Sequence, residues 1–301
     1  MKMRLGINNC FAVKRWPEPS AWAGMVRDRL GLRFVQFSLD LLDPRTDGAA
    51  RREMIARTRA AAAECSLEIS SAFTGLAAYS SSMLLHPSLP MRMDALEWYE
   101  RTVGLSAELG AEAAGGHFGA LSCTDYAERR RRDYLEDFLM EALVHLSGVA
   151  RREGLERLLW EPMPVLREAP ATIREAERLH EKANRSAVVP IGFCLDLGHQ
   201  CAAGTRAADR DPYEWLRRLG PLCPCIHLQQ TDGEADHHWP FTERYNASGI
   251  IQPEKVVDAL GRSGAQDVEL IFEVIHPFEA ADEAVLEDLA LSVNHWRGVV
   301  S

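Results

Sequence analysis

The stretch Gly192-Phe193-Cys194-Leu195-Asp196 is a continuous apolar run that ends in a residue able to bind a metal ion. Continuous apolar runs of this length are typical of strands that are buried on both faces of a parallel sheet. Three further runs have the same form and end in Glu, His and Glu: Leu158-Leu159-Trp160-Glu161, Cys225-Ile226-His227 and Leu270-Ile271-Phe272-Glu273. We therefore predict four buried strands whose ends carry ionisable residues to one place.

Strand-like and helical segments alternate along the whole chain. The expected strands are 4–9, 33–39, 67–73, 113–118, 157–162, 191–197, 224–229 and 269–275. The clearest helical patterns are Ala49–Cys65, Met91–Leu109, Tyr134–Glu153, Ala171–Ala183, Pro253–Ser263 and Glu283–Trp296. Glycines that can end a helix stand before three of the expected strands: Gly110 before the fourth, Gly154 before the fifth, and Gly261 and Gly264 before the eighth. Eight strand–helix units predict an α/β fold, a single (β/α)8 TIM barrel, with one domain spanning residues 1–301.

A doubly wound open sheet is the alternative to a barrel. Such a sheet normally has a glycine-rich phosphate-binding turn after its first strand, and this chain has Asn8-Asn9-Cys10-Phe11 there. The turn therefore favours the barrel, whose active site would lie at the carboxyl ends of the strands.

The overall charge and the cysteines limit the functional classes. A net charge of −10 argues against a duplex nucleic-acid partner, and acidic residues flank the basic run Arg129–Arg132, which we interpret as a solvated helix face. The seven cysteines are odd in number and irregularly spaced, which is not typical of a disulfide framework and favours a reducing cytoplasm. No apolar run approaches the ~18 residues of a membrane span, and we recognise no signal peptide. A homo-oligomer stays open; Trp22, Trp215 and Trp296, which we expect to be exposed on helices, would mark subunit contacts or outer-layer packing.

The four strand-end residues form a candidate metal site. Three carboxylates and one imidazole suit a divalent ion of intermediate hardness, with Mn²⁺ first and Mg²⁺, Co²⁺ or Zn²⁺ as alternatives. Burying four ionisable groups side by side costs several kcal/mol unless a cation compensates them. The predicted ligands are Glu161, Asp196, His227 and Glu273.

Further polar residues follow the predicted strands and are candidates for binding a hydroxylated substrate. Each also has a plainer interpretation as a loop residue, an ion-pair partner or a satisfied core residue. The candidates are Asn9, His117, Arg167, Glu168, His199, Gln229, His238 and Trp239. Lys14 and Arg15 are the best basic candidates for a phosphate group near the mouth.

The predicted site suits proton transfer at the carbon beside a ketose carbonyl. A ketose that chelates the ion through its carbonyl and a neighbouring hydroxyl can lose an α-proton and form a metal-stabilised cis-enediolate. Glu161 and Glu273 would then take and return the proton. Return to the same carbon on the opposite face is epimerisation, and return to the adjacent carbon is isomerisation. The sequence favours neither outcome.

At these residues the chain resembles the xylose-isomerase-like barrel superfamily, which includes sugar-phosphate isomerases and epimerases, ketose 3-epimerases, hydroxypyruvate isomerase and endonuclease IV. The resemblance implies that Glu161, Asp196, His227 and Glu273 are the metal set, that the two Glu are the acid/base pair, and that His199 contacts substrate. A closer likeness, over nearly the whole chain, is to bacterial erythrulose-phosphate epimerases and isomerases. It rests on Asn9-Cys10-Phe11, Val35-Gln36, Ser70–Gly75, Gly116-His117-Phe118-Gly119, Trp160–Met163, Asp211-Pro212-Tyr213, His238–Thr242 and Pro253–Val256.

One departure from this resemblance concerns the substrate. We expect a Lys in the motif of the seventh strand, where this chain has Gln229 or Gln230. The missing cation admits a neutral or carboxylated sugar derivative in place of a sugar phosphate. The leading prediction is a metal-dependent ketose or ketose-phosphate isomerase or epimerase acting on a small molecule such as a tetrulose phosphate. The alternative is a metal-dependent lyase, a decarboxylase or dehydratase, acting on a 3-oxo sugar acid; an endonuclease and a non-catalytic sugar-binding barrel fit less well.

Overall fold

A closed barrel of eight strands forms the centre of the structure, a computed structural model that describes residues 1–300. Each strand pairs in parallel with its neighbours in the chain, and β8 pairs with β1 to close the barrel. The strands are β1 (Lys2–Asn8), β2 (Phe34–Ser38), β3 (Glu68–Phe73), β4 (Ala113–Gly116), β5 (Arg157–Trp160), β6 (Ile191–Asp196), β7 (Cys225–Leu228) and β8 (Asp267–Phe272). The predicted (β/α)8 fold is confirmed, and all eight expected strands are present within a few residues.

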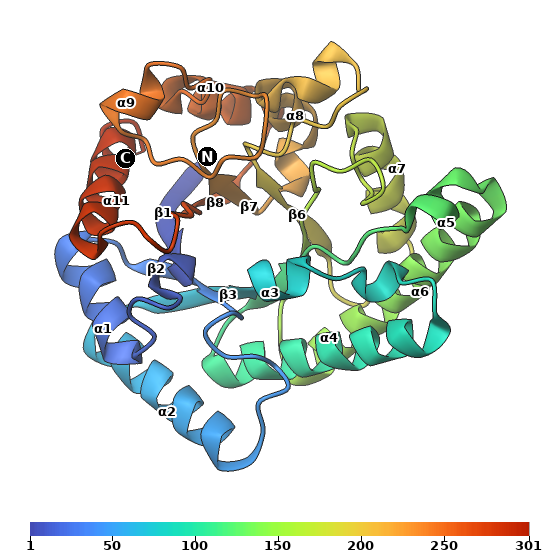
Figure 1. Cartoon of the computed structure of the whole chain (residues 1–301), viewed down its shortest axis with the longest axis horizontal. Helices are drawn as coiled ribbons and strands as arrows, with labels where there is room; N and C mark the ends of the chain where they lie inside the picture. Colours follow the sequence, from blue (N-terminus) through green and yellow to red (C-terminus); the bar gives the residue numbers. More distant parts are fainter. Residues whose placement is uncertain (301) are drawn as a thin grey trace.

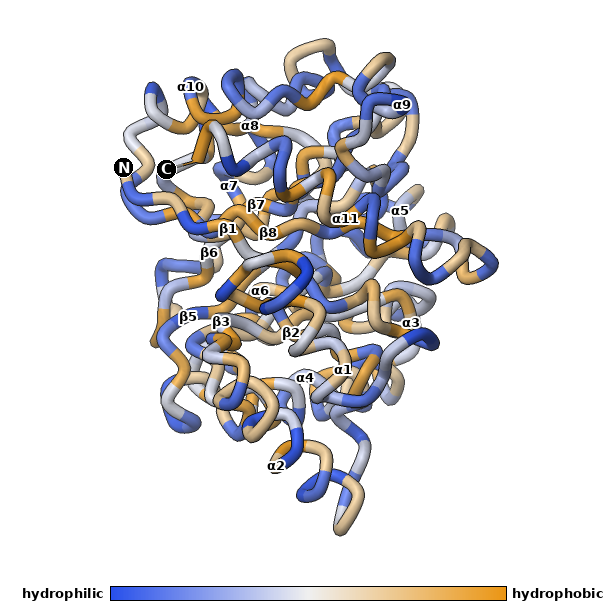
Figure 2. The backbone as a smooth tube through the Cα atoms, turned by 90° about the vertical axis from the view of Figure 1, so that its left-hand side faces the viewer, coloured by the Kyte–Doolittle hydropathy of each residue, from blue (hydrophilic) through white to orange (hydrophobic). Residues whose placement is uncertain are grey.

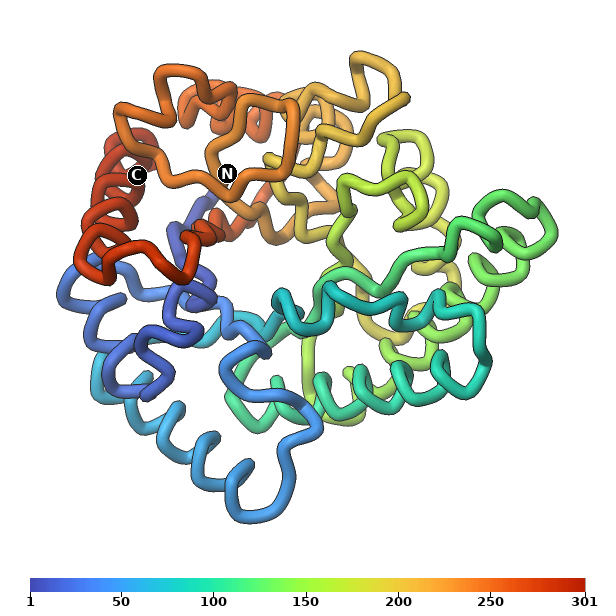
Figure 3. Tube along the Cα trace, in the orientation of Figure 1, coloured from blue at the N-terminus to red at the C-terminus, as the bar shows by residue number. Residues whose placement is uncertain are grey.

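Helices surround the barrel on its outside, and the chain passes around it once, so that the first and last units are neighbours (Figures 1 and 3). They are α1 (Pro19–Gly24), α2 (Gly48–Glu64), α3 (Leu76–Tyr79), α4 (Leu89–Leu109), α5 (Cys123–Ala127), α6 (Arg129–Glu153), α7 (Ile173–Asn184), α8 (Pro212–Leu219), α9 (Glu243–Asn246), α10 (Pro253–Ser263) and α11 (Asp282–Arg297). The expected glycine stops are present at Gly110, Gly154 and Gly264, which end α4, α6 and α10 in the left-handed conformation. Gly261 lies inside α10 and does not end it.

The hydrophobic core has two parts. The larger part lies between the strands and the surrounding helices, and a small inner layer fills the barrel; it consists of Phe73, Ala113, Leu159, Cys194, Cys225 and Ile271. In Figure 2 the strands β7 and β8 are largely hydrophobic, whereas hydrophobic and hydrophilic residues alternate along the helices. The expectation that Trp22, Trp215 and Trp296 are exposed is wrong, because all three are buried in the core between barrel and helices. These tryptophans therefore give no support for a subunit interface.

Strand β4 leaves no room for a side chain at Gly115, which pairs with Leu159 of β5. A Cβ atom at this position would lie 2.0 Å from the carbonyl oxygen of Leu159 and 2.6 Å from its Cβ. We predict that Gly115→Ala destabilises the protein by ~3 kcal/mol, since overpacking forces the two strands apart. Gly104→Ala is the matched control: it lies in α4 with no atom within 4 Å, and the change is expected to stabilise by ~0.5–1 kcal/mol. Thermal melting of both variants tests this, and a Gly115→Ala protein that melts with wild type would contradict it.

Within residues 1–300, no helix combines the length and apolar character that crossing a membrane requires. The seven cysteines all lie in this range and none forms a disulfide, in agreement with the interpretation of their spacing.

Candidate active site

The four predicted metal ligands lie together at the carboxyl ends of strands β5 to β8. Asp196 is the last residue of β6 and pairs in register with His227 in β7. Glu161 and Glu273 directly follow β5 and β8. All four side chains are buried, and each offers a ligand atom within 4.8 Å of the others. The barrel thus brings together side chains that are up to 112 positions apart along the chain.

His227 lies between the two glutamates. Its Nδ1 atom is 3.1 Å from Glu161 Oε1, 2.9 Å from Glu273 Oε2 and 3.8 Å from Asp196 Oδ2. Its other ring nitrogen, Nε2, is 2.7 Å from the side-chain oxygen of Gln36. Because the Gln36 amide oxygen can only accept, Nε2 carries a proton. Burial lowers the pKa of His227, but Glu273 and Glu161 outweigh it and raise the pKa well above its ordinary value, so that Nδ1 can donate to the carboxylates in the protonated ring.

The charges at this cluster fit a divalent cation. Three carboxylates face a single imidazole, and Asp196 Oδ2 is buried without a hydrogen-bond partner within residues 1–300. Buried carboxylates without compensation are costly, and an ion would supply the partner that Asp196 Oδ2 lacks. The set of three oxygens and one nitrogen also suits the predicted metals. The role of the four residues as ligands stays a prediction.

The pKa values of the two glutamates are shifted in opposite directions. Burial raises the pKa of Glu161 above its ordinary value, although His227 opposes the shift. Burial also acts on Glu273, but the charge and hydrogen bond of His227 outweigh it, so that the pKa of Glu273 is lowered. Asn8 adds a hydrogen bond to Glu273, with 2.8 Å between Asn8 Nδ2 and Glu273 Oε1. An acid and a base with separated pKa values are therefore present side by side.

A cavity of about 120 Å³ opens above the cluster. Glu161 and Glu273 line it, as do three of the predicted substrate-binding residues, His117, His199 and His238. Its volume is below the ~300 Å³ of ordinary ligand pockets, which favours a small substrate. The remaining lining residues are Asn8, Cys10, Ser38, Asp40, Thr74, Gly75, Leu76, Tyr79, Met163, Asp236 and Ile275.

Three other predicted binding residues lie behind the cavity wall. Asn9 is fully buried and accepts a hydrogen bond from the backbone of Ser38, and its neighbour Asn8 lines the cavity in its place. Gln229 is also fully buried. Trp239 stacks on His237, with 3.9 Å between the ring centroids. A direct contact of these residues with substrate stays a prediction, and their observed contacts are within the protein.

Arg167 and Glu168 also lie outside the cavity lining. Arg167 donates a hydrogen bond to the carbonyl of Leu121 at 2.8 Å. Glu168 is buried, and burial, followed by the nearby charge of Glu161, raises its pKa to about 7. Glu168 therefore holds its proton at a pH where an exposed glutamate is ionised.

This shift predicts a pH-dependent stability. Between pH 4.5 and 7 the folded state holds the Glu168 proton, whereas the unfolded state releases it. The free energy of unfolding therefore falls as pH rises through this range and is ~3 kcal/mol lower above pH 7 than below pH 4.5. Glu168→Gln is expected to remove this loss. Its melting temperature should match wild type near pH 4.5 and exceed it at pH 8, whereas the exposed Glu141→Gln should follow wild type throughout. Parallel melting curves of Glu168→Gln and wild type across this range would refute the assignment.

Asp236 is the main site residue that the sequence reasoning missed. It lies in the loop after β7 and lines the cavity, with its carboxylate 3.3 Å from His199 Nε2 and 3.2 Å from His238 Nε2. Burial would lower the pKa of His238, but Asp236 outweighs it and raises the pKa to about 9. The same loop holds Asp232 and Glu234, and no sequence signal separates the acid that faces the cavity from those that face solvent.

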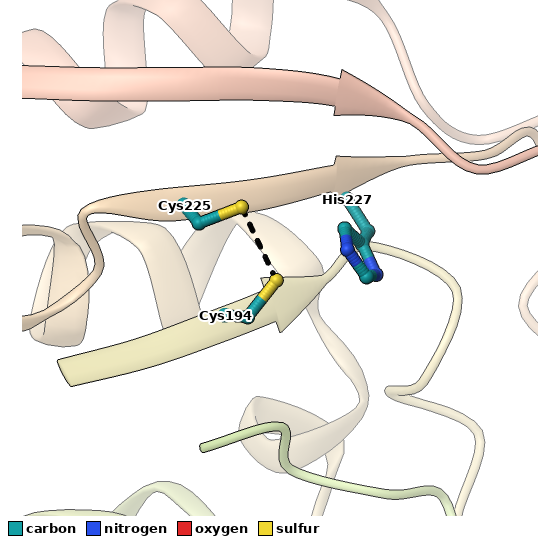
Figure 4. A group of neighbouring side chains, drawn as sticks. All are labelled: Cys194, Cys225 and His227. Atoms are coloured by element: carbon teal, nitrogen blue, oxygen red, sulfur yellow. Dashed lines mark hydrogen bonds between the residues drawn. The ribbon is translucent and has the colours of Figure 1, made fainter. Parts of the chain in front are cut away.

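Two cysteines lie beneath the site. Cys194 and Cys225 pair in register on β6 and β7, with 3.3 Å between their sulfur atoms, and His227 follows on the same strand as Cys225 (Figure 4). With His227 they also offer three possible ligand atoms within 4.8 Å. Burial raises the pKa of the Cys194 thiol well above its ordinary value, and both thiols belong to the apolar inner layer. They therefore act as small buried hydrophobes, as the sequence predicts.

A closed parallel barrel with a cavity lined by buried acids and imidazoles at the carboxyl ends of its strands has the architecture of the TIM-barrel enzymes. Residues 28–291 match the family of xylose isomerase-like TIM barrels, and the chain belongs to this family. The resemblance seen in the sequence is thereby confirmed.

Three proteins similar to this one each align with nearly the whole chain. The D-erythrulose 1-phosphate 3-epimerase of Brucella abortus (strain 2308) is 27% identical over 299 residues, which are 98% of this chain and 96% of that protein. The crystal structure of a xylose isomerase-like protein from Rhodospirillum rubrum is 33% identical, with a TM-score of 0.92 and 99% of each chain covered. The D-psicose 3-epimerase of Clostridium cellulolyticum H10 shares the fold at 14% identity, with a TM-score of 0.74 and coverage of 99% and 100%.

Proposed function

We propose that the chain is a metal-dependent ketose or ketose-phosphate epimerase or isomerase in which Glu161 and Glu273 transfer the proton. The observation that carries the proposal is the pair of buried glutamates, which line one cavity and both contact Nδ1 of His227. The similarity to a D-erythrulose 1-phosphate 3-epimerase supports this reaction class.

The metal would be held by Glu161, Asp196, His227 and Glu273, and Mn²⁺ suits this set best, with Mg²⁺, Co²⁺ or Zn²⁺ as alternatives. A bound divalent ion would polarise the substrate carbonyl and so make the neighbouring C–H bond more acidic. The unpartnered Asp196 Oδ2 supports a cation at this place.

The protein's own residues would move the proton. Glu273, whose pKa is lowered, is ionised and is the candidate base that removes the proton from the carbon beside the carbonyl. Glu161, whose pKa is raised, is the candidate acid that returns a proton. Asn8 fixes the orientation of Glu273, and His199, whose Nδ1 atom lies 3.0 Å from the carbonyl oxygen of Pro162, keeps its other nitrogen toward the cavity. Return to the opposite face of the same carbon gives epimerisation.

Solvent deuterium exchange tests the proposed reaction. Mn²⁺-loaded protein would be incubated in D₂O with a panel of tetruloses, pentuloses and their phosphates and followed by NMR. We expect deuterium to enter at a carbon beside the carbonyl of at least one ketose. If none of them exchanges, the proposal fails, and release of CO₂ from 3-oxo sugar acids is the next reaction to measure.

A cytoplasmic location belongs to the same proposal. It is supported by the seven unpaired cysteines, two of which are buried with 3.3 Å between their sulfur atoms, since thiols of this kind persist in a reducing compartment.

A further inference from the structure

Asp236 has a fixed position at the outer part of the cavity. Gln229 donates hydrogen bonds to Asp236 Oδ1 at 2.7 Å and to Asp196 Oδ1 at 2.9 Å, so one buried amide ties the loop to the base of the site. The backbones of Gln230 and Trp239 pair with each other at the two ends of the loop. The Asp236 carboxylate is therefore part of the cavity wall and not a freely moving surface acid.

A second carboxylate, Asp40, lies on another part of the wall. Its two oxygens accept hydrogen bonds from the backbone N–H groups of Leu76 and Ala77, at 2.8 and 3.1 Å. Those N–H groups lie in the first turn of the short helix α3. Since Asp40 already occupies them, they are not available to a substrate phosphate.

No lysine or arginine lines the cavity within residues 1–300. Arg15, one of the two basic residues predicted to hold a phosphate, donates instead to the carbonyls of Pro277 and Ala280 and to Asp282. Lys14, the other, places its Nζ over the ring of Phe278, 4.6 Å from the centroid, and does not line the cavity. The two imidazoles at the outer wall, His199 and His238, already face Asp236. Each of these two imidazoles is thus paired with a carboxylate of the protein itself.

We propose that Asp236 is a specificity-determining residue that, with Asp40, selects a ketose with an uncharged, hydroxyl-bearing end over the corresponding phosphate ester. Carboxylates accept hydrogen bonds from hydroxyl groups. A phosphate monoester with a charge of about −1.5 to −2 at pH 7 finds no free cation, because Asp236 holds the two imidazoles and Asp40 occupies the N–H groups at the start of α3. Specificity arises here because the phosphate ester would be left without a charge partner, as much as by attraction of the free sugar. This inference rests on the proposed function and decides between its two substrate classes.

The test compares matched pairs of substrates. Exchange rates would be measured for a free tetrulose and a free pentulose and for the phosphate ester of each, with wild type, Asp236→Asn and Asp232→Asn. We expect wild type to favour the free sugars by at least about tenfold in kcat/KM, because a phosphate that leaves water without gaining a cationic partner loses several kcal/mol. In Asp236→Asn this ratio should fall by at least about tenfold, because His199 and His238 lose the carboxylate that pairs with them and become free to face a phosphate, while the shape of the wall is kept. Asp232, in the same loop, contacts His237 and the backbone of Glu234 and does not line the cavity, so Asp232→Asn should keep the wild-type ratio.

The ratio within one variant is insensitive to a general loss of activity. A wild-type preference for the phosphate ester, or an unchanged ratio in Asp236→Asn, would overturn the inference while leaving the proposed reaction in place. Saturation-transfer NMR of the same pairs gives a readout without turnover. If no ketose exchanges at all, the proposed reaction fails, and binding of the phosphate ester in preference to the free sugar would overturn the specificity separately.

Discussion

Replacing Glu273 by Gln is expected to reduce ketose exchange by roughly 10³-fold, within the range that positioned acid–base groups contribute. The physical reason is that an amide cannot take the proton, while its shape and its carbonyl oxygen keep the hydrogen bond from Asn8. The fold should be retained, because Glu273 follows β8 and forms no part of the apolar core. Exchange rates by NMR, together with melting temperature and metal content, are the measurements.

Glu269→Gln is the matched control for this variant. Glu269 lies on the same strand but contacts Arg4 at 3.1 Å, and it does not line the site cavity. Its exchange rate should remain close to wild type. Wild-type exchange in Glu273→Gln, with the protein fully folded, would exclude the two-glutamate mechanism and leave only a binding role for this residue.

Removal of divalent metal is expected to have an effect of similar size. Chelation should reduce exchange to the background rate, and Mn²⁺ should restore it, since the site would lose the cation that compensates three buried carboxylates. A ligand that binds only the folded state at 100 times its Kd adds ~2.7 kcal/mol of stability, so the metal-loaded protein should also melt at a higher temperature.

Asp196→Asn provides the control for metal removal. The amide keeps the size of the side chain but weakens the ligand set, so chelator should change the melting temperature of this variant far less than that of wild type. Elemental analysis must show that the metal has been removed. A protein stripped in this way that still exchanges at the full rate would rule out metal dependence.

The barrel could be predicted from the sequence because its signals are local. An apolar run such as Gly192–Asp196 and a glycine stop such as Gly154 depend on neighbours within a few residues, and both are present as expected. The position of the strand ends could also be predicted, because parallel strands in a closed barrel direct their carboxyl ends to one mouth. Glu161 and Glu273 could therefore be placed at one site before any distance was known.

The loop residues could not be placed in this way. Asn8 and Asn9 are adjacent and chemically identical, yet one lines the cavity and the other binds the backbone of Ser38. Asp236 was not distinguished from Asp232, because the contact that fixes it comes from Gln229, which also binds Asp196. A side chain's direction in a long loop depends on such contacts between distant segments, and no periodicity reports them.

The sequence by itself determined the number and order of the strands and the four ionisable residues at their ends, because each is set by local hydrophobic pattern. Only the tertiary structure decided which side chains surround the cavity and how they are charged. The opposite pKa shifts of Glu161 and Glu273, and the pairing of Asp236 with two imidazoles at the cavity wall, follow from burial and from partners brought together by closure of the barrel.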